Sequence, residues 1–188
     1  MEAISDYKYF GLWAFVILVA GLVFTIWKWP AENHLTFSQR VALQKQSIIY
    51  YVCLFSIVLP LLLTFIIGWF APSFQLSVWF SIFVIVASFL QYTATLIPEI
   101  GGWKTKVHRH ISGISGVCLV PPLLILLFTD SLSPLGKVSV ILGLILMLGM
   151  IVFANVTKKE RYEVSYIHQS IFYAGFFIPI LVVSYLLV

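Results

Sequence analysis

Charged side chains are scarce in this sequence. Asp, Glu, Lys and Arg make up 10% of its 188 residues, whereas a typical soluble domain has about 25%. Hydrophobic residues make up 61%, and the mean hydropathy is +1.04. This composition leaves no room for a water-soluble domain beside the apolar runs. We therefore expect a single all-α transmembrane domain over residues 1–188.

Asp, Glu, Lys and Arg are missing from the middle of every long apolar run. Ion-coupled transporters and pumps usually place such a residue at depth, because it carries the coupling. A retinal protein would need a mid-helix lysine. The absence therefore disfavours pumps and rhodopsins, and leaves facilitated diffusion or a lipid pathway open.

Cysteine and metal-binding motifs are also sparse. The two cysteines, Cys53 and Cys118, both lie in apolar runs and are expected to be small packing groups rather than a disulfide framework. The sequence contains no His-Glu-x-x-His or Cys-x-x-Cys pattern. We expect no cofactor.

Six long apolar runs are present, and each has about the 20 residues that a helix needs to cross a bilayer core. They predict a six-helix transmembrane bundle with helices at about residues 10–29, 46–70, 75–97, 110–128, 136–156 and 164–187.

Positive charge is concentrated in alternate loops, which predicts the orientation, and only Lys8 and Lys137 lie on the other side. Nine of the eleven Lys and Arg residues lie between the first and second, third and fourth, and fifth and sixth runs: Lys28, Arg40, Lys45, Lys104, Lys106, Arg109, Lys158, Lys159 and Arg161. Positive residues in short loops are retained on the cytoplasmic side. Both termini are therefore predicted on the non-cytoplasmic side. Because the net charge of +4 is spread over loops, we expect no nucleic-acid partner.

Polar residues collect at the predicted cytoplasmic ends of the helices. Gln91, Thr95 and Glu99 recur every four positions and so share one helix face. Similar stripes enter the fourth and sixth helices. If the stripes face one another, they line a polar crevice open to the cytosol. Its predicted ligand-binding residues are Gln91, Thr95, Glu99, His110, Asn155, His168, Gln169 and Tyr173.

The neighbouring basic residues suit an anionic headgroup. Lys104, Lys106 and Arg109 precede or begin the predicted fourth helix. Each cation near an anionic leaflet contributes about 1 kcal/mol. We therefore expect these three residues to contact lipid headgroups.

A metal site is the alternative use of the same polar residues. His108, His110, His168 and Glu99 would supply nitrogen and oxygen ligands with an open position, as in catalytic zinc sites. Against this, a His-x-His pair on a helix points its two rings about 160° apart.

The segment over residues 30–45 predicts a short amphipathic element leading into the second helix, with Thr36 or Ser38 as a helix cap. Pro60, Pro121, Pro122 and Pro179 are each expected to bend the helix that contains them.

In layout the chain resembles the DRAM-like six-helix membrane proteins and their bacterial relatives. The matching stretches are His34 to Gln39, Ile97 to Gly102 and His108 to Gly116. At the position of Gln39 that group typically has an acidic residue. The resemblance implies a membrane-embedded fold and lipid handling, without a defined reaction.

The function predicted from these patterns is the binding or transport of a lipid or small amphiphile by a multi-pass protein of the plasma or inner membrane, without enzymatic activity. Membrane lipids, a second copy of the chain or another membrane protein are the expected partners. Two alternatives remain: a membrane-embedded, metal-dependent hydrolase, and a structural subunit of a membrane complex.

Overall fold

The computed structural model describes residues 5–31, 35–156 and 165–186, and this part of the chain is helical with no strand. Six helical stretches in it are long and apolar enough to cross a membrane. They comprise α1 (Lys8–Lys28), α3 (Lys45–Phe65) continued by η2 (Ile66–Phe70) and α4 (Ala71–Ser73), α5 (Val78–Leu96), α6 (Gly102–Cys118) continued by α7 (Val120–Leu127), α8 (Pro134–Val156) and α9 (Ser165–Tyr185). A single 3-10 turn, η1 (Ser5–Tyr7), precedes α1, and the short helix α2 (Phe37–Ala42) lies between α1 and α3.

The six predicted spans are confirmed, but two of their boundaries differ. The fourth helix begins at Gly102, not near residue 110, so its first two turns are polar and project beyond the apolar run. Ala71–Ser73 is helical, so the turn before α5 lies later than the apolar run indicates. The loop basic residues Lys158, Lys159 and Arg161 lie outside the described residues.

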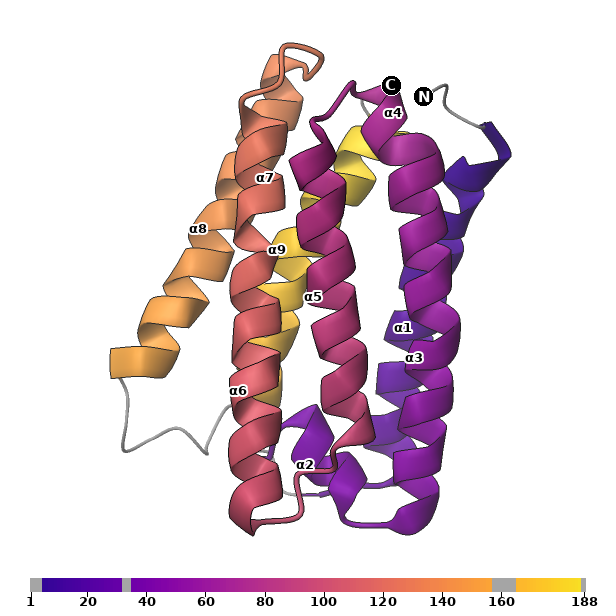
Figure 1. Cartoon of the computed structure of the whole chain (residues 1–188), viewed down its shortest axis with the longest axis vertical. Coiled ribbons are helices and arrows are strands. Elements are labelled where there is room, and N and C mark those ends of the chain that lie inside the picture. The colour runs from indigo at the N-terminus through magenta and orange to yellow at the C-terminus, as the bar shows by residue number, and fades with distance from the viewer. Residues whose placement is uncertain (1–4, 32–34, 157–164, 187–188) are drawn as a thin grey trace.

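The helices form a bundle in which the start of α1 and the end of α9 lie at the same end (Figure 1). The Tyr185 hydroxyl donates to the carbonyl of Lys8 and accepts from the amide of Leu12. At the opposite end, α2 lies between the helix ends (Figure 1).

Proline interrupts the fourth span as expected. The helix breaks at Leu119, whose amide bonds the carbonyl of Gly116, and resumes as α7 with prolines at its start. The reason is that Pro121 and Pro122 lack the amide hydrogens that a continuous helix would use. Pro60 and Pro179 lie inside α3 and α9 without ending them.

Two glycines allow α8 and α9 to pack closely. A Cβ added at Gly143 would collide with the carbonyl oxygen of Gly175, and one added at Gly175 would lie 2.9 Å from the carbonyl oxygen of Gly143. Small residues at such crossings let backbones approach in membrane bundles. Gly149, on the same helix, has nothing within 4 Å of an added Cβ.

The packing is uneven along the bundle. Near α4, the rings of Phe65, Phe70 and Phe80 are fully buried and contact one another in sequence. Large apolar side chains such as Phe89 and Leu142 face outward, which suits a helix surface in contact with lipid. Toward α2 the side chains leave a cavity between the helices, and this cavity is the candidate site described below.

Candidate ligand cavity

A cavity of about 330 Å³ lies inside the bundle, between its middle and α2. Its walls come from α1, α3, α5, α6 and α9. Aliphatic and aromatic side chains dominate the lining, including Leu18, Leu22, Phe55, Leu59 and Phe176. The volume is at the lower end of the roughly 300–1,000 Å³ typical of small-molecule sites. None of the described residues lining it is Asp, Glu, Lys or Arg.

Polar groups gather at the α2 end of this cavity. They include the side chains of Ser38, Tyr51, Ser88, Gln91, His108, Ser112, Gln169 and Tyr173. The Tyr173 hydroxyl donates to the Gln91 side-chain oxygen at 3.0 Å, and so links α9 to α5. The cavity is therefore amphipathic, with a polar end near α2 and an apolar body.

The wall between α1 and α9 reaches the outer surface. The contacts seen between these helices lie in the half away from α2: Tyr185 with Lys8 and Leu12, and Phe15 with Phe177. Nearer α2, the cavity is lined by Val19 and Val23 of α1, which are 42% and 58% exposed, and by the exposed Ser170 of α9. The cavity lining between α1 and α9 thus includes residues that are also exposed on the outside of the bundle.

The α2 helix covers the end at which a cytosolic opening was expected. Its Phe37 amide donates to the side-chain oxygen of Gln169 at 3.2 Å, and its Arg40 guanidinium lies 5.7 Å from the Tyr166 ring. Phe37 and Ser38 line the cavity. At this end α2 therefore forms part of the cavity wall.

Thr36 caps α2, as one of the two expected capping residues, although the helix it caps is α2 rather than α3. Its hydroxyl accepts from the Gln39 amide at 3.0 Å, and the Gln39 side chain accepts from the Thr36 amide at 2.9 Å. This reciprocal pair is a capping box. It leaves the Thr36 hydroxyl hydrogen available to another acceptor.

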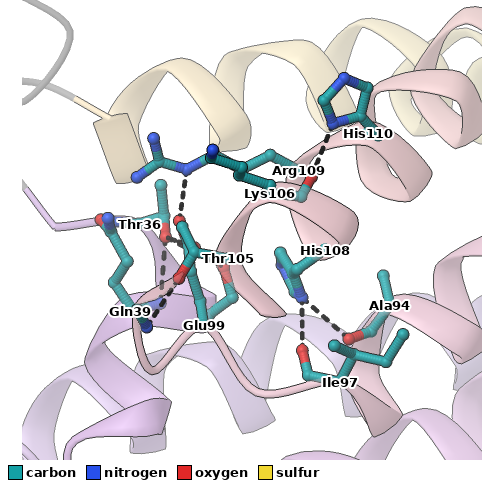
Figure 2. A network of polar contacts seen from close by, with 12 residues as sticks. Thr36, Gln39, Ala94, Ile97, Glu99, Thr105, Lys106, His108, Arg109 and His110 are labelled. Atoms are coloured by element: carbon teal, nitrogen blue, oxygen red, sulfur yellow. Dashed lines mark hydrogen bonds and ion pairs between the residues drawn. The ribbon is translucent and has the colours of Figure 1, made fainter. Parts of the chain in front are cut away.

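Glu99 is that acceptor, and it fastens α2 to the connection between α5 and α6 (Figure 2). One carboxylate oxygen accepts from Thr36 at 3.2 Å and from Ser38 at 2.9 Å, and the other pairs with the Arg109 guanidinium at 2.6 Å. The Glu99 side chain is 2% exposed and that of Arg109 is 44% exposed. A buried charge held by an ion pair and two hydroxyls meets the requirement that burial sets.

Two glycines shape the turn that presents Glu99. Gly101 and Gly102 have φ angles of 98° and 59°, in the region that favours glycine. The Gly101 amide donates to the Thr105 hydroxyl at 2.7 Å. The chain thereby reverses directly after Glu99 and enters α6.

The neighbouring histidines point in different directions, as the helix geometry predicted (Figure 2). His108 is buried, and its Nδ1 lies 2.9 Å and 2.8 Å from the carbonyl oxygens of Ala94 and Ile97. His110 is exposed, and its Nδ1 bonds the carbonyl of Lys106 on its own helix. His108, not His110, lines the cavity.

The expected crevice residues divide into several environments. Gln91, Gln169 and Tyr173 line the cavity. Thr95 donates to the carbonyl of Tyr92 in its own helix, and the His168 ring packs 4.4 Å from the Phe153 ring. Glu99 lies behind Ser38, bound to α2, as described above.

The remaining predicted residues are placed as follows. Lys104 and Lys106 lie in the polar first turns of α6 and do not line the cavity. Asn155 lies in α8 but outside the residues whose side chains are described. Among the described residues, no three of His, Cys, Asp or Glu come close enough to hold a metal ion. The alternative set of His108, His110, His168 and Glu99 is accordingly not gathered at one point.

Several cavity residues were not singled out from the sequence as binding residues. Ser38 had been considered only as a cap, and Tyr51 and Ser88 had not been considered. The pattern Thr36-x-x-Gln39 was the available signal for α2, because it is the sequence signature of a capping box. Tyr51 and Ser88 carry no such signal, since single polar residues in apolar helices most often serve packing.

No protein-family model, curated protein or solved structure matched this chain. Its class therefore follows from its own structure. Six helices long and apolar enough to cross a membrane, with apolar side chains turned outward, are those of a multi-pass helical membrane protein. Its distinguishing feature within the described residues is an uncharged cavity at one end of the bundle.

Proposed function

We propose that this protein binds a lipid or small amphiphile in the cavity and exchanges it with the surrounding bilayer. The single observation that supports this most is the cavity's division into an apolar body and a polar end. An amphiphile has the same division. The exposed lining residues between α1 and α9 provide a route from the bilayer that does not pass through water.

The proposal includes an orientation. The basic loops are taken as cytoplasmic, because Lys and Arg in short loops are retained on that side. The polar end of the cavity then lies at the cytoplasmic leaflet, and both chain ends lie on the opposite side. Lys104 and Lys106, on the outer surface of α6, would contact the phosphates of the surrounding leaflet at about 1 kcal/mol per charge. The loose resemblance to DRAM-like proteins is compatible with such lipid handling.

Lipid analysis of the purified protein tests this proposal. The protein is extracted gently and its bound lipid is measured by native mass spectrometry. A variant that fills the cavity, Ala174→Phe, is compared with Ala20→Phe. Ala174 lines the cavity, whereas Ala20 is exposed on α1 and does not line it.

We expect a discrete lipid on the wild type and on Ala20→Phe, and its loss from Ala174→Phe. Equal lipid on all three proteins would show that the bound molecules lie on the outer surface, and would contradict the proposal. A bare wild-type protein that co-purifies with another membrane protein would instead favour a structural subunit.

A further inference from the structure

The polar groups at the α2 end of the cavity are electrically neutral. Besides His108, those that line it are hydroxyls of Ser and Tyr and amides of Gln. Glu99 and Arg109, beside this end, are paired with each other, and the buried Arg40 of α2 is not among the residues that line the cavity. An ionised headgroup placed in the cavity would therefore lose its water without gaining an opposite charge, which is costly.

Several of these neutral groups have no partner within the described part of the chain. No hydrogen bond is made by the hydroxyls of Tyr51, Ser88 and Ser112, or by the side-chain nitrogen of Gln91, which uses only its oxygen, toward Tyr173. Buried polar groups are normally hydrogen-bonded. None of these atoms is completely buried. They are therefore accessible from the cavity and available to a ligand. All of them can donate.

His108 supplies the complementary acceptor. Its Nδ1 faces the carbonyl oxygens of Ala94 and Ile97, which only accept hydrogen bonds, so Nδ1 carries the hydrogen. In the neutral imidazole, the other nitrogen, Nε2, is then an acceptor. Nε2 has no hydrogen-bond partner in the described part of the chain, and it is not completely buried.

From this arrangement we propose that the ligand is an uncharged amphiphile whose polar group carries both a hydroxyl and a carbonyl oxygen, as in a monoacylglycerol. The ligand hydroxyl donates to Nε2 of His108. Its carbonyl oxygen accepts from the donors that line the same end, such as Ser112 and Gln91. The apolar chain occupies the cavity body. This inference rests on the proposed function, because it names the ligand of the same cavity.

Competitive photolabelling in lipid nanodiscs tests the ligand class. The probe is a monoacylglycerol with a photoreactive group in its chain, and mass spectrometry locates the labelled peptides. The competitors are unlabelled monooleoylglycerol and oleoyl lysophosphatidic acid, which has the same chain and an added phosphate. We expect labelling of cavity residues, and at least tenfold stronger competition by monooleoylglycerol.

The role of His108 is tested by His108→Asn. An asparagine amide can still donate to the carbonyls that Nδ1 contacts, but it has no acceptor where Nε2 stands. The matched control is His110→Asn, the same change at an exposed position on the same helix. We expect monooleoylglycerol competition to weaken about tenfold in His108→Asn, the effect of one hydrogen bond, and to be unchanged in the control.

Ser112→Ala and Tyr51→Phe provide the same test without touching the carbonyl contacts, should His108→Asn not fold. The outcomes separate the two proposals. Equal or stronger competition by lysophosphatidic acid, or unchanged competition in all the cavity variants, overturns the neutral-ligand inference and leaves lipid binding in place. Labelling confined to the outer surface overturns both.

Discussion

Glu99 is the residue on which the polar end of this bundle depends most directly. Its buried carboxylate is satisfied by Arg109 from α6 and by two hydroxyls that belong to Thr36 and Ser38. The three contacts join segments that are otherwise separate in sequence. Removal of one partner leaves a buried charge with too few hydrogen bonds, and that loss is more costly than the gain from forming the pair.

We predict that Arg109→Gln lowers the free energy of unfolding by about 1–3 kcal/mol, because the Glu99 carboxylate loses its ion pair. Lys106→Gln, at an exposed position three residues earlier, is the control and should change stability by less than about 0.5 kcal/mol. Thermal unfolding of the detergent-solubilised protein measures both. Equal stability of the two variants would show that the pair is not stabilising.

The histidines show how far sequence reasoning reaches at this scale. The spacing of His108 and His110 established that their rings diverge, and the structure confirms it. Which ring faces inward depends on how α6 packs against α5, and spacing carries no information about that. Polar residues of α5 and α9 were expected to meet, and Gln91 and Tyr173 do so. His168 does not join them, because its ring packs against Phe153 of α8.

Among the secondary-structure elements, the short helix α2 depends on a few hydrogen bonds to its neighbours. Its six residues are too few for a stable isolated helix. The capping box, the bond from Phe37 to Gln169 and the contacts with Glu99 therefore hold it in place.

The substitution Thr36→Val should weaken the attachment of α2 to the rest of the bundle. The variant loses the hydroxyl that caps the helix and bonds Glu99, at a cost of about 1–2 kcal/mol. Amide hydrogen exchange in Phe37–Ala42 should then become about tenfold faster. Thr93→Val is the control, because that hydroxyl bonds only the carbonyl of Phe89 in its own helix. An unchanged exchange rate in α2 would mean that the contacts of α2 other than those of the Thr36 hydroxyl are enough to hold the helix in place.

The crossing of α8 and α9 gives a second prediction for the elements. Gly143→Ala places a methyl group against the Gly175 carbonyl and should destabilise the protein by about 1–3 kcal/mol. Gly149→Ala, with open space at that position, should be neutral or slightly stabilising, because alanine favours helix. Unfolding in detergent distinguishes the two. Destabilisation of both variants alike would argue against a specific close crossing.

Element boundaries were predicted where hydrophobicity decides them and missed where polar interactions do. The apolar runs located all six spans because lipid contact requires such runs. The first turns of α6 were not predicted as helix, because Lys104, Lys106 and the residues around them do not belong to an apolar run. The break at Leu119 was foreseeable from Pro121 and Pro122, because proline acts through backbone chemistry alone.

For the whole molecule, the proposed orientation in the membrane follows from where the positive charge lies. In the structure, Asp130 and Gly102 lie at opposite ends of the α6–α7 span. Positive charge is concentrated at the Gly102 end. The orientation proposed above therefore places residue 130 outside the cell or in the periplasm.

Cysteine labelling in a variant with Cys53 and Cys118 replaced by serine tests this. An impermeant maleimide should label Asp130→Cys in intact cells, and Lys104→Cys only after permeabilisation. The reverse pattern would invert the topology and move the polar end of the cavity to the other leaflet.

The position of α2 in the chain also sets an order for assembly during synthesis. Its partner Glu99 follows Ser38 by 61 residues, and Gln169 follows Phe37 by 132 residues. At about 5–20 residues per second, the interval before Gln169 is made is roughly 7–26 s. The second span and Glu99 are made within that interval, and for the remainder of it α2 lacks only its partner on α9. The bond between α2 and α9 therefore forms only after the last helix has been made, so the speed of translation sets the earliest time at which this wall of the cavity is complete.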